Sequence, residues 1–134
     1  MVRGRFKVGA TQTGKKTMNR YLLSIFQPAV THPDPEVLGT IMADVGALIQ
    51  ELEASDVLVL NAGLAAPDTA KVARFDAGDV LTTDGAFVET KEHLGGFVVV
   101  STETEEEALE WGRKLSRATT LPIEIRSFAV HAGN

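Results

Sequence analysis

The stretch "GFVVV", residues 96–100, decides the fold expected for this chain of 134 residues. A phenylalanine followed by three valines places apolar side chains on both faces of an extended strand, since successive side chains point in opposite directions. Such a strand is typical of the middle of a sheet that other layers cover on both sides. The sequence therefore predicts a central strand over Gly96–Val100.

A second strand of the same kind is expected near the start of the chain. In "RYLLSIF", Arg20–Phe26, Leu22 and Phe26 fall on one face, and apolar residues at the alternating positions fall on the other. This strand is also expected to lie inside a sheet with two covered faces.

Two helices are expected between the strands. The first begins after a capping Asp34 with Pro35 at its first position and runs to about Ser55. Gly39 and Gly46 are costly inside this helix, so we expect them to mark close packing against the sheet. Its apolar residues recur at intervals of three and four: Val37, Ile41, Val45, Leu48, Ile49 and Leu52.

The second helix lies in "STETEEEALEWGRKLSR", residues 101–117. A capping box is offered either by Thr102 with Glu105 or by Thr104 with Glu107. Trp111 is expected in the core or in a contact between subunits.

The remaining strands are shorter. "DVLVLNAGL" is expected to be a buried strand ending at Gly63, and "LPIEIRSFAV" the last strand of the domain, with Glu124 and Arg126 facing outward. Lys71–Phe75 and Val80–Thr83 are expected to pair as a hairpin.

The order of elements predicts an α+β, ferredoxin-like fold of the split βαβ type with an extra β-hairpin. Two helices cover only one face of such a sheet, whereas the central strands are apolar on both. A second copy of the chain can cover the other face, so we expect a homodimer packed sheet to sheet. The alternative is a loop that folds over the sheet.

The charge and composition of the chain argue against some classes of binding partner. The first 17 residues hold five of the 13 Lys and Arg and no Asp or Glu, so the rest, with eight basic and 18 acidic side chains, carries −10. An acidic body argues against direct nucleic acid binding. No apolar run is long enough to span a membrane, and the chain has no cysteine, which fits a cytoplasmic protein.

Residues 1–17 are expected to be a basic, disordered extension, or an upstream start placed before a true start at Met18, and residues 18–134 the domain proper. A basic tether and a targeting peptide are the alternatives.

The loop between Asp84–Gly85 and Gly95–Gly96 carries the candidate site. Asp84 and His93 are the candidate catalytic residues, because a carboxylate and an imidazole can exchange protons near neutral pH. The ligand-binding candidates are Asp84, Glu89, Lys91, Glu92 and His93. The alternative is a structural turn, since Asp-Gly is a common turn dipeptide.

No cofactor and no metal are expected. Oxygen and nitrogen donors are present in the loop, but no paired-histidine spacing supports zinc. Phosphate-binding glycine motifs and the serine-hydrolase elbow are absent from the sequence.

Several ordered motifs resemble one known family. They are "YLLSIFQP", "GLAAP" at 63–67, "TTDGAFVETKEHLGGF" at 82–97, "EALEW" at 107–111 and "LPIEIRSF". Together they are similar to the DGPF group within the YCII-related family, over Met18 to about Phe128. Ala86 stands where that group usually has proline.

The resemblance implies a dimeric α/β barrel-type arrangement of ferredoxin-like domains. Some members of the family are encoded beside sigma factors of the extracytoplasmic-function type. A histidine–aspartate pair proposed for the YCII branch places its histidine on the first helix, and this chain has none there.

Two functions therefore remain open. The first is small-molecule binding with acid–base chemistry at the loop. The second is a regulatory or interaction module that acts with a sigma factor.

Overall fold

The computed structural model describes residues 17–28, 34–85 and 91–129. The expected extension at 1–17 therefore lies, apart from Thr17, outside the described residues. The elements are β1 (Asn19–Pro28), α1 (Pro35–Ala54), β2 (Leu58–Gly63), a 3-10 turn (Pro67–Thr69), β3 (Lys71–Asp76), β4 (Asp79–Asp84), β5 (Glu92–Thr102), α2 (Glu105–Thr119) and β6 (Ile123–Ser127).

Four strands form an antiparallel sheet in the order β2-β5-β1-β6. The first βαβ unit, β1-α1-β2, is split because β5 lies between its two strands. The predicted α+β class and the order of elements are confirmed, and this topology is compatible with a ferredoxin-like fold. The expected central positions of β1 and β5 are also confirmed.

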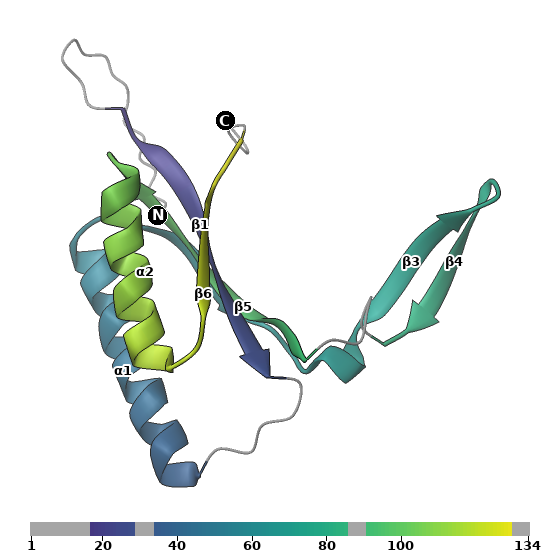
Figure 1. Cartoon of the computed structure of the whole chain (residues 1–134), viewed down its shortest axis with the longest axis horizontal. Coiled ribbons are helices and arrows are strands. Elements are labelled where there is room, and N and C mark those ends of the chain that lie inside the picture. The colour runs from purple at the N-terminus through teal and green to yellow at the C-terminus, as the bar shows by residue number, and fades with distance from the viewer. Residues whose placement is uncertain (1–16, 29–33, 86–90, 130–134) are drawn as a thin grey trace.

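Both helices lie on one face of this sheet (Figure 1). Their buried side chains meet alternate residues of the central strands, which the strand period of two places on the same face. Trp111 packs against this core with Lys114 Nζ 4.9 Å from its ring centroid. The buried cluster is Tyr21, Leu23, Leu48, Leu52, Val98, Val100, Ala108 and Leu115.

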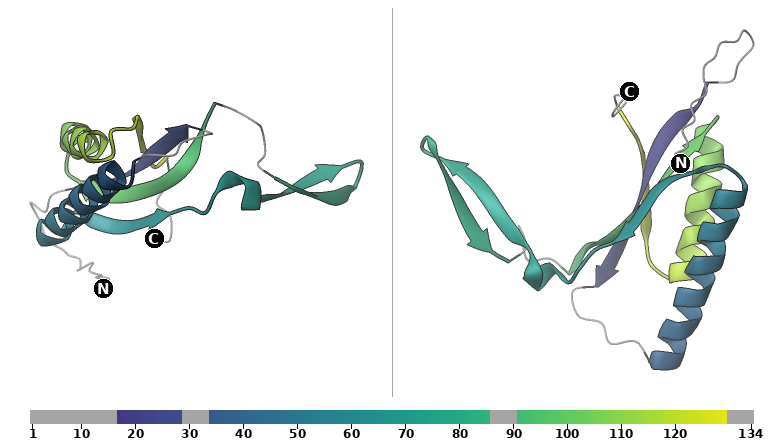
Figure 2. Two further views of the ribbon diagram at one scale, coloured as in Figure 1. Left: turned by 90° about the horizontal axis from the view of Figure 1, so that it is seen from below. Right: turned by 180° about the vertical axis from the view of Figure 1, so that it is seen from behind.

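The opposite face of the sheet has no helix over it in the described part of the chain (Figure 2). We call this surface the open face. Strand register places on it Leu22 beside Val99 and Leu60, and Ser24 beside Phe97. Ser24 and Val99 are buried among their neighbours, whereas Leu60 is 54% exposed. The expectation that the two helices cover only one face of the sheet is therefore confirmed.

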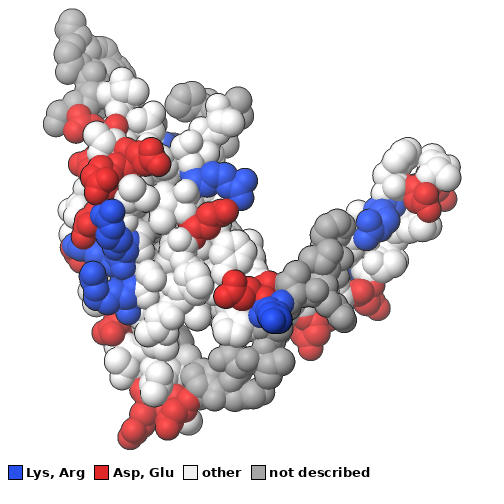
Figure 3. Space-filling model, viewed as in Figure 1, with Lys and Arg blue, Asp and Glu red and all other residues white. Residues whose placement is uncertain are grey.

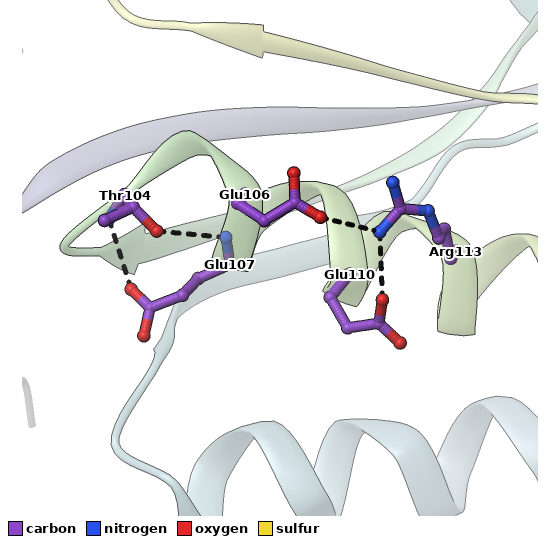
Figure 4. Close-up of polar contacts among 5 residues, drawn as sticks. All are labelled: Thr104, Glu106, Glu107, Glu110 and Arg113. Carbon is purple, nitrogen blue, oxygen red and sulfur yellow. Dashed lines mark hydrogen bonds and ion pairs between the residues drawn. The ribbon is translucent and has the colours of Figure 1, made fainter.

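Local capping signals set where the helices begin. The Asp34 carboxylate accepts a hydrogen bond from the Glu36 backbone N–H at 3.0 Å, as expected. At α2 the Thr104 and Glu107 pair forms the capping box, each side chain accepting from the other's backbone N–H (Figure 4). Of the two pairs that the sequence offered, only this one is used.

An ion-pair cluster continues along α2 from that cap. The guanidinium of Arg113 donates to Glu110 at 2.9 Å and to Glu106 at 3.1 Å (Figure 4). The hydrogen bond to Glu110, followed by that to Glu106, raises the pKa of Arg113. The group is exposed, so the cluster contributes to the solvated side of the helix and not to the core.

The expectation of close packing at Gly39 and Gly46 is wrong. Both are exposed, and a Cβ at either position would meet no atom within 4 Å. The close contact is instead at Gly112 on α2, where a Cβ would lie 2.7 Å from Ile125 Cδ1. Gly112 lets α2 approach β6, whereas the glycines of α1 lie on parts of the helix that contact nothing so closely.

The expectation that "DVLVLNAGL" is a buried strand is also wrong. Within it, Val59 is 41% exposed. β2 is an edge strand, and its register slips between Leu58 and Leu60, which turns apolar side chains away from the helix layer.

β5 begins earlier than the expected Gly96. It starts at Glu92, so the second half of the expected loop is strand. A bulge near Gly95 lets β5 continue past the glycine pair, because the register shifts between Ile25 and Phe26. At Gly96 a Cβ would lie 2.9 Å from the Ala62 carbonyl oxygen, so this glycine permits close strand approach.

The expected hairpin is confirmed, but it stands apart from the main sheet. β3 and β4 form a separate two-stranded sheet, which we call the arm, residues 71–84. The arm leaves the body beyond β2, on the side away from the helices, so that the body and the arm diverge like the limbs of a V (Figures 1 and 2).

Candidate functional site

Asp84 lies at the base of the arm, as the last residue of β4. Its Oδ1 accepts a hydrogen bond from Lys71 Nζ at 2.8 Å, and the two residues are directly opposite in the hairpin register. The next residue, Gly85, has φ of +95° and donates its N–H to the Ala70 carbonyl at 2.7 Å. Gly85 thus adopts a backbone conformation that favours glycine, and Asp84 has a structural partner.

His93 lies in a different sheet. It occupies β5 of the four-stranded sheet, directly opposite Gln27 on β1. Alternation along β1 places Gln27 on the same face as Ile25, which packs against the core below the helices. Both His93 and Gln27 are half-buried. The imidazole and the amide therefore belong to the helix-covered side, at the end of the sheet where β1 finishes.

Gly95 shapes this end of the sheet. A Cβ at this position would lie 2.6 Å from the Gln27 side-chain oxygen Oε1. The Gln27 side chain therefore lies over the glycine, and the glycine pair is explained by packing of strands and side chains.

The other expected ligand-binding residues do not all lie in one place. Lys91 and Glu92 are exposed beside His93, at the start of β5, and Glu89 lies outside the described residues. The structure therefore brings 91–93 together along one strand and places Asp84 in the arm. Whether these groups act on one ligand stays a prediction.

An apolar strip of α1 overhangs this end of the sheet. Along one side of the helix, Leu52 is 1% exposed and Leu48 is buried, Val45 and Ile41 are half-buried, and Leu38 is 43% exposed. Positions spaced by three and four share one helix face, so the same face that packs in the core emerges from it. Figures 1 and 2 show α1 continuing past the end of β1.

The length of this overhang follows from helix geometry. From Leu48 to Leu38 the helix rises about 15 Å at 1.5 Å per residue. Apolar surface and two half-buried polar groups thus occur at one end of the fold. Sequence reasoning missed Gln27 and Leu38, because only the register of β1 with β5 and the length of α1 beyond the sheet reveal them.

The described residues contain neither a metal-ligand cluster nor a helix suited to crossing a membrane. No group of three or more His, Asp and Glu side chains in this part of the chain is arranged to hold a metal ion. Neither of its helices combines the length and apolar character that crossing a membrane requires.

Comparison with known proteins decides the family. The sequence model of the YCII-related domain family matches residues 18–127. This range includes the four-stranded sheet and both helices. The chain belongs to the YCII-related family. This YCII-related protein is also 33% identical over 93 residues to "Uncharacterized protein R00369" of Rhizobium meliloti (strain 1021), across 68% of this chain and 75% of the relative. The resemblance in the motifs is thereby confirmed at the level of the family.

Proposed function

We propose that this YCII-related protein binds a small amphipathic molecule beside His93 and works as a homodimer. The ligand's apolar part lies against the overhanging strip of α1, and its polar part bonds to His93 and Gln27. The observation that carries the proposal is that the continuous strip from buried Leu52 to exposed Leu38 emerges at the same end of the fold as the two half-buried polar groups (Figure 1).

The chemistry of this site is acid–base in character. An imidazole can take or give a proton near neutral pH, and an amide can both donate and accept hydrogen bonds. Exposed Lys91 and Glu92 precede His93 at the rim. The proposal therefore assigns His93 as the candidate proton-transfer group and Gln27 as the group that orients the ligand.

The homodimer is proposed on the open face. The apolar side chains of this face include exposed Leu60 and Leu94, and exposed apolar groups that cluster on one face mark contact surfaces. The charged pair on it, Arg126 with Glu124 at 3.0 Å, is self-complementary: about a twofold axis, each charge can meet its opposite on the partner. Two sheets meeting in this way form the expected barrel-type dimer.

Membership of the DGPF group is also part of this proposal. It is supported by "TTDGAFVETKEHLGGF", in which only the proline of the group's name is replaced, by Ala86. Action with a sigma factor stays a prediction that rests on the resemblance alone.

The first experiment is a native mass spectrum of protein purified under mild conditions. A species of twice 14.4 kDa supports the dimer, and additional mass identifies a retained ligand. A spectrum of monomer at every concentration overturns the dimer.

The ligand site is tested with the amphipathic probe 8-anilinonaphthalene-1-sulfonate. We expect Leu38→Gln and His93→Ala each to weaken saturable probe binding at least fivefold. Ala43→Gln, an exposed position on the opposite side of α1, is the matched control and leaves binding unchanged. Equal binding by the wild type and both site variants contradicts the site.

A further inference from the structure

The arm is a two-stranded sheet with no core of its own. β3 and β4 pair with each other, and the main links at their base are the Lys71–Asp84 ion pair and the Gly85 to Ala70 hydrogen bond. Isolated two-stranded hairpins are marginally stable in water. Yet the arm exposes large apolar side chains, with Phe75 73% exposed. The arm therefore has the features of a surface that another layer covers.

The two faces of the arm differ in charge. Residues opposite each other in the register share a face, so Phe75 and Val80 form the outer part of one face. Lys71 and Asp84 close the inner end of this face and neutralise each other at 2.8 Å. The other face carries Arg74 opposite Leu81 and Asp76 opposite Asp79. Only the Phe75/Val80 face offers an apolar surface without net charge.

The open face and the arm bound one hollow. The helices lie on the outer side of the body, and the arm diverges from the other side (Figures 1 and 2). In the space-filling view the space between the body and the arm stays empty toward the tip of the arm (Figure 3). Charged side chains gather along the helices, and side chains of both signs also border the hollow on the body and on the arm (Figure 3).

We propose that a second copy of this chain fills the hollow, and that the Phe75/Val80 face of each arm packs against the partner. This inference rests on the homodimer proposed above and extends it, because the arm adds a second contact to the open face. Each copy then gives one arm and receives one, as an isologous twofold contact requires.

Charge does not prevent a second copy from being the occupant. The chain carries a net charge of −5, so two copies repel each other except where their surfaces are uncharged. The open face carries the Glu124–Arg126 pair and, by strand alternation, Arg20, whereas the Phe75/Val80 face of the arm carries the balanced Lys71–Asp84 pair. A strongly charged partner would find no net opposite charge on the arm face.

Size explains why the arm acts together with the open face. Six residues of strand extend about 20 Å at about 3.3 Å per residue, and two strands are about 10 Å wide. Such a face is small beside the ~800 Å² that each partner buries in a standard interface. The arm therefore reinforces a sheet-to-sheet contact and does not replace it.

The test is a sedimentation-velocity dilution series on the full chain. We expect the Phe75→Ser/Val80→Ser double variant to raise the dimer Kd at least tenfold. Leu81→Ser, on the other face of the arm, is the matched control and changes Kd less than twofold. Leu60→Asp on the open face yields monomer. Far-UV circular dichroism and the melting temperature check that the variants fold.

The possible results distinguish failure of the proposed arm contact from failure of the proposed dimer. A wild type that stays monomeric overturns both proposals. A dimer whose Kd is unchanged in the double variant, or is raised equally by Leu81→Ser, overturns the arm contact and leaves the dimer standing.

A second measurement detects the arm contact directly and does not rely on weakening the dimer. Photoactivation of p-benzoylphenylalanine in place of Phe75 is expected to give a covalent dimer, and the same group in place of Leu81 is not. Only monomer after photoactivation at position 75 contradicts the arm contact.

Discussion

Lys71 and Asp84 face each other across the base of the arm, with Nζ 2.8 Å from Oδ1 and both side chains largely exposed. The carboxylate of Asp84, which the sequence indicates as a candidate catalytic group, thus forms an ion pair within the arm. Exposed ion pairs contribute about 0–1 kcal/mol to stability. The pair holds the ends of β3 and β4 together where the arm meets the body.

The first prediction concerns Asp84→Asn. We expect the free energy of unfolding to fall by less than about 1 kcal/mol, since an exposed pair is lost. Probe binding is expected to persist, because the proposed site is centred on His93. Urea denaturation and fluorescence titration measure the two effects. Loss of binding with unchanged stability would restore Asp84 as a binding residue, and Lys71→Met would then show whether the pair acts as a unit.

The second prediction compares two helical glycines. Gly112→Ala is expected to destabilise the fold by about 1–3 kcal/mol, because its Cβ would lie 2.7 Å from Ile125 Cδ1. Gly46→Ala is the matched control: the same gain in helix propensity, with nothing within 4 Å, should stabilise by about 0.5–1 kcal/mol. Chemical denaturation of both variants decides. Shifts in the same direction would mean that α2 does not need the glycine to approach β6.

The third prediction concerns the glycine pair in β5. Gly96→Ala is expected to cost about 1–3 kcal/mol, since its Cβ would lie 2.9 Å from the Ala62 carbonyl oxygen, which is backbone and cannot rotate away. Gly63→Ala in the neighbouring strand has open space and serves as the control. Thermal melts of the two variants provide the measurement. A Gly96→Ala variant as stable as its control would show that β2 and β5 need no such close approach.

The fourth prediction tests the overhang of α1. Leu52→Ala is expected to cost about 2–5 kcal/mol, because it removes a fully buried side chain. Leu38→Ala, on the same side of the helix, is expected to change stability by no more than about 0.5 kcal/mol. Denaturant midpoints measure both. A large loss from Leu38→Ala would mean that the exposed end of the strip is packed within the monomer.

Local patterns were the reliable part of sequence reasoning. The limits of α1, the cap at Asp34 and the hairpin follow from spacing, capping and turn residues, which act over a few positions. The family also followed from short ordered motifs. The two-faced apolar strands predicted their own central place in the sheet.

Errors arose where a residue's surroundings come from distant parts of the chain. A glycine in a helix is compatible both with close packing and with an open surface. Gly112 differs from Gly46 only because Ile125 of β6 lies against it. The burial expected for β2 failed because an edge strand with a slipped register exposes apolar side chains that look internal in sequence.

The candidate site shows the same division. The loop residues were recognisable from their chemistry, but the pairing of His93 with Gln27 depends on a register across more than 60 residues and on the bulge near Gly95. The elements, their order and the family follow from the sequence, because these depend on local periodicity and motifs. Tertiary structure alone decided that Asp84 joins the arm and His93 the main sheet, and which apolar surfaces stay uncovered, because strand pairing and helix packing join residues far apart in the chain.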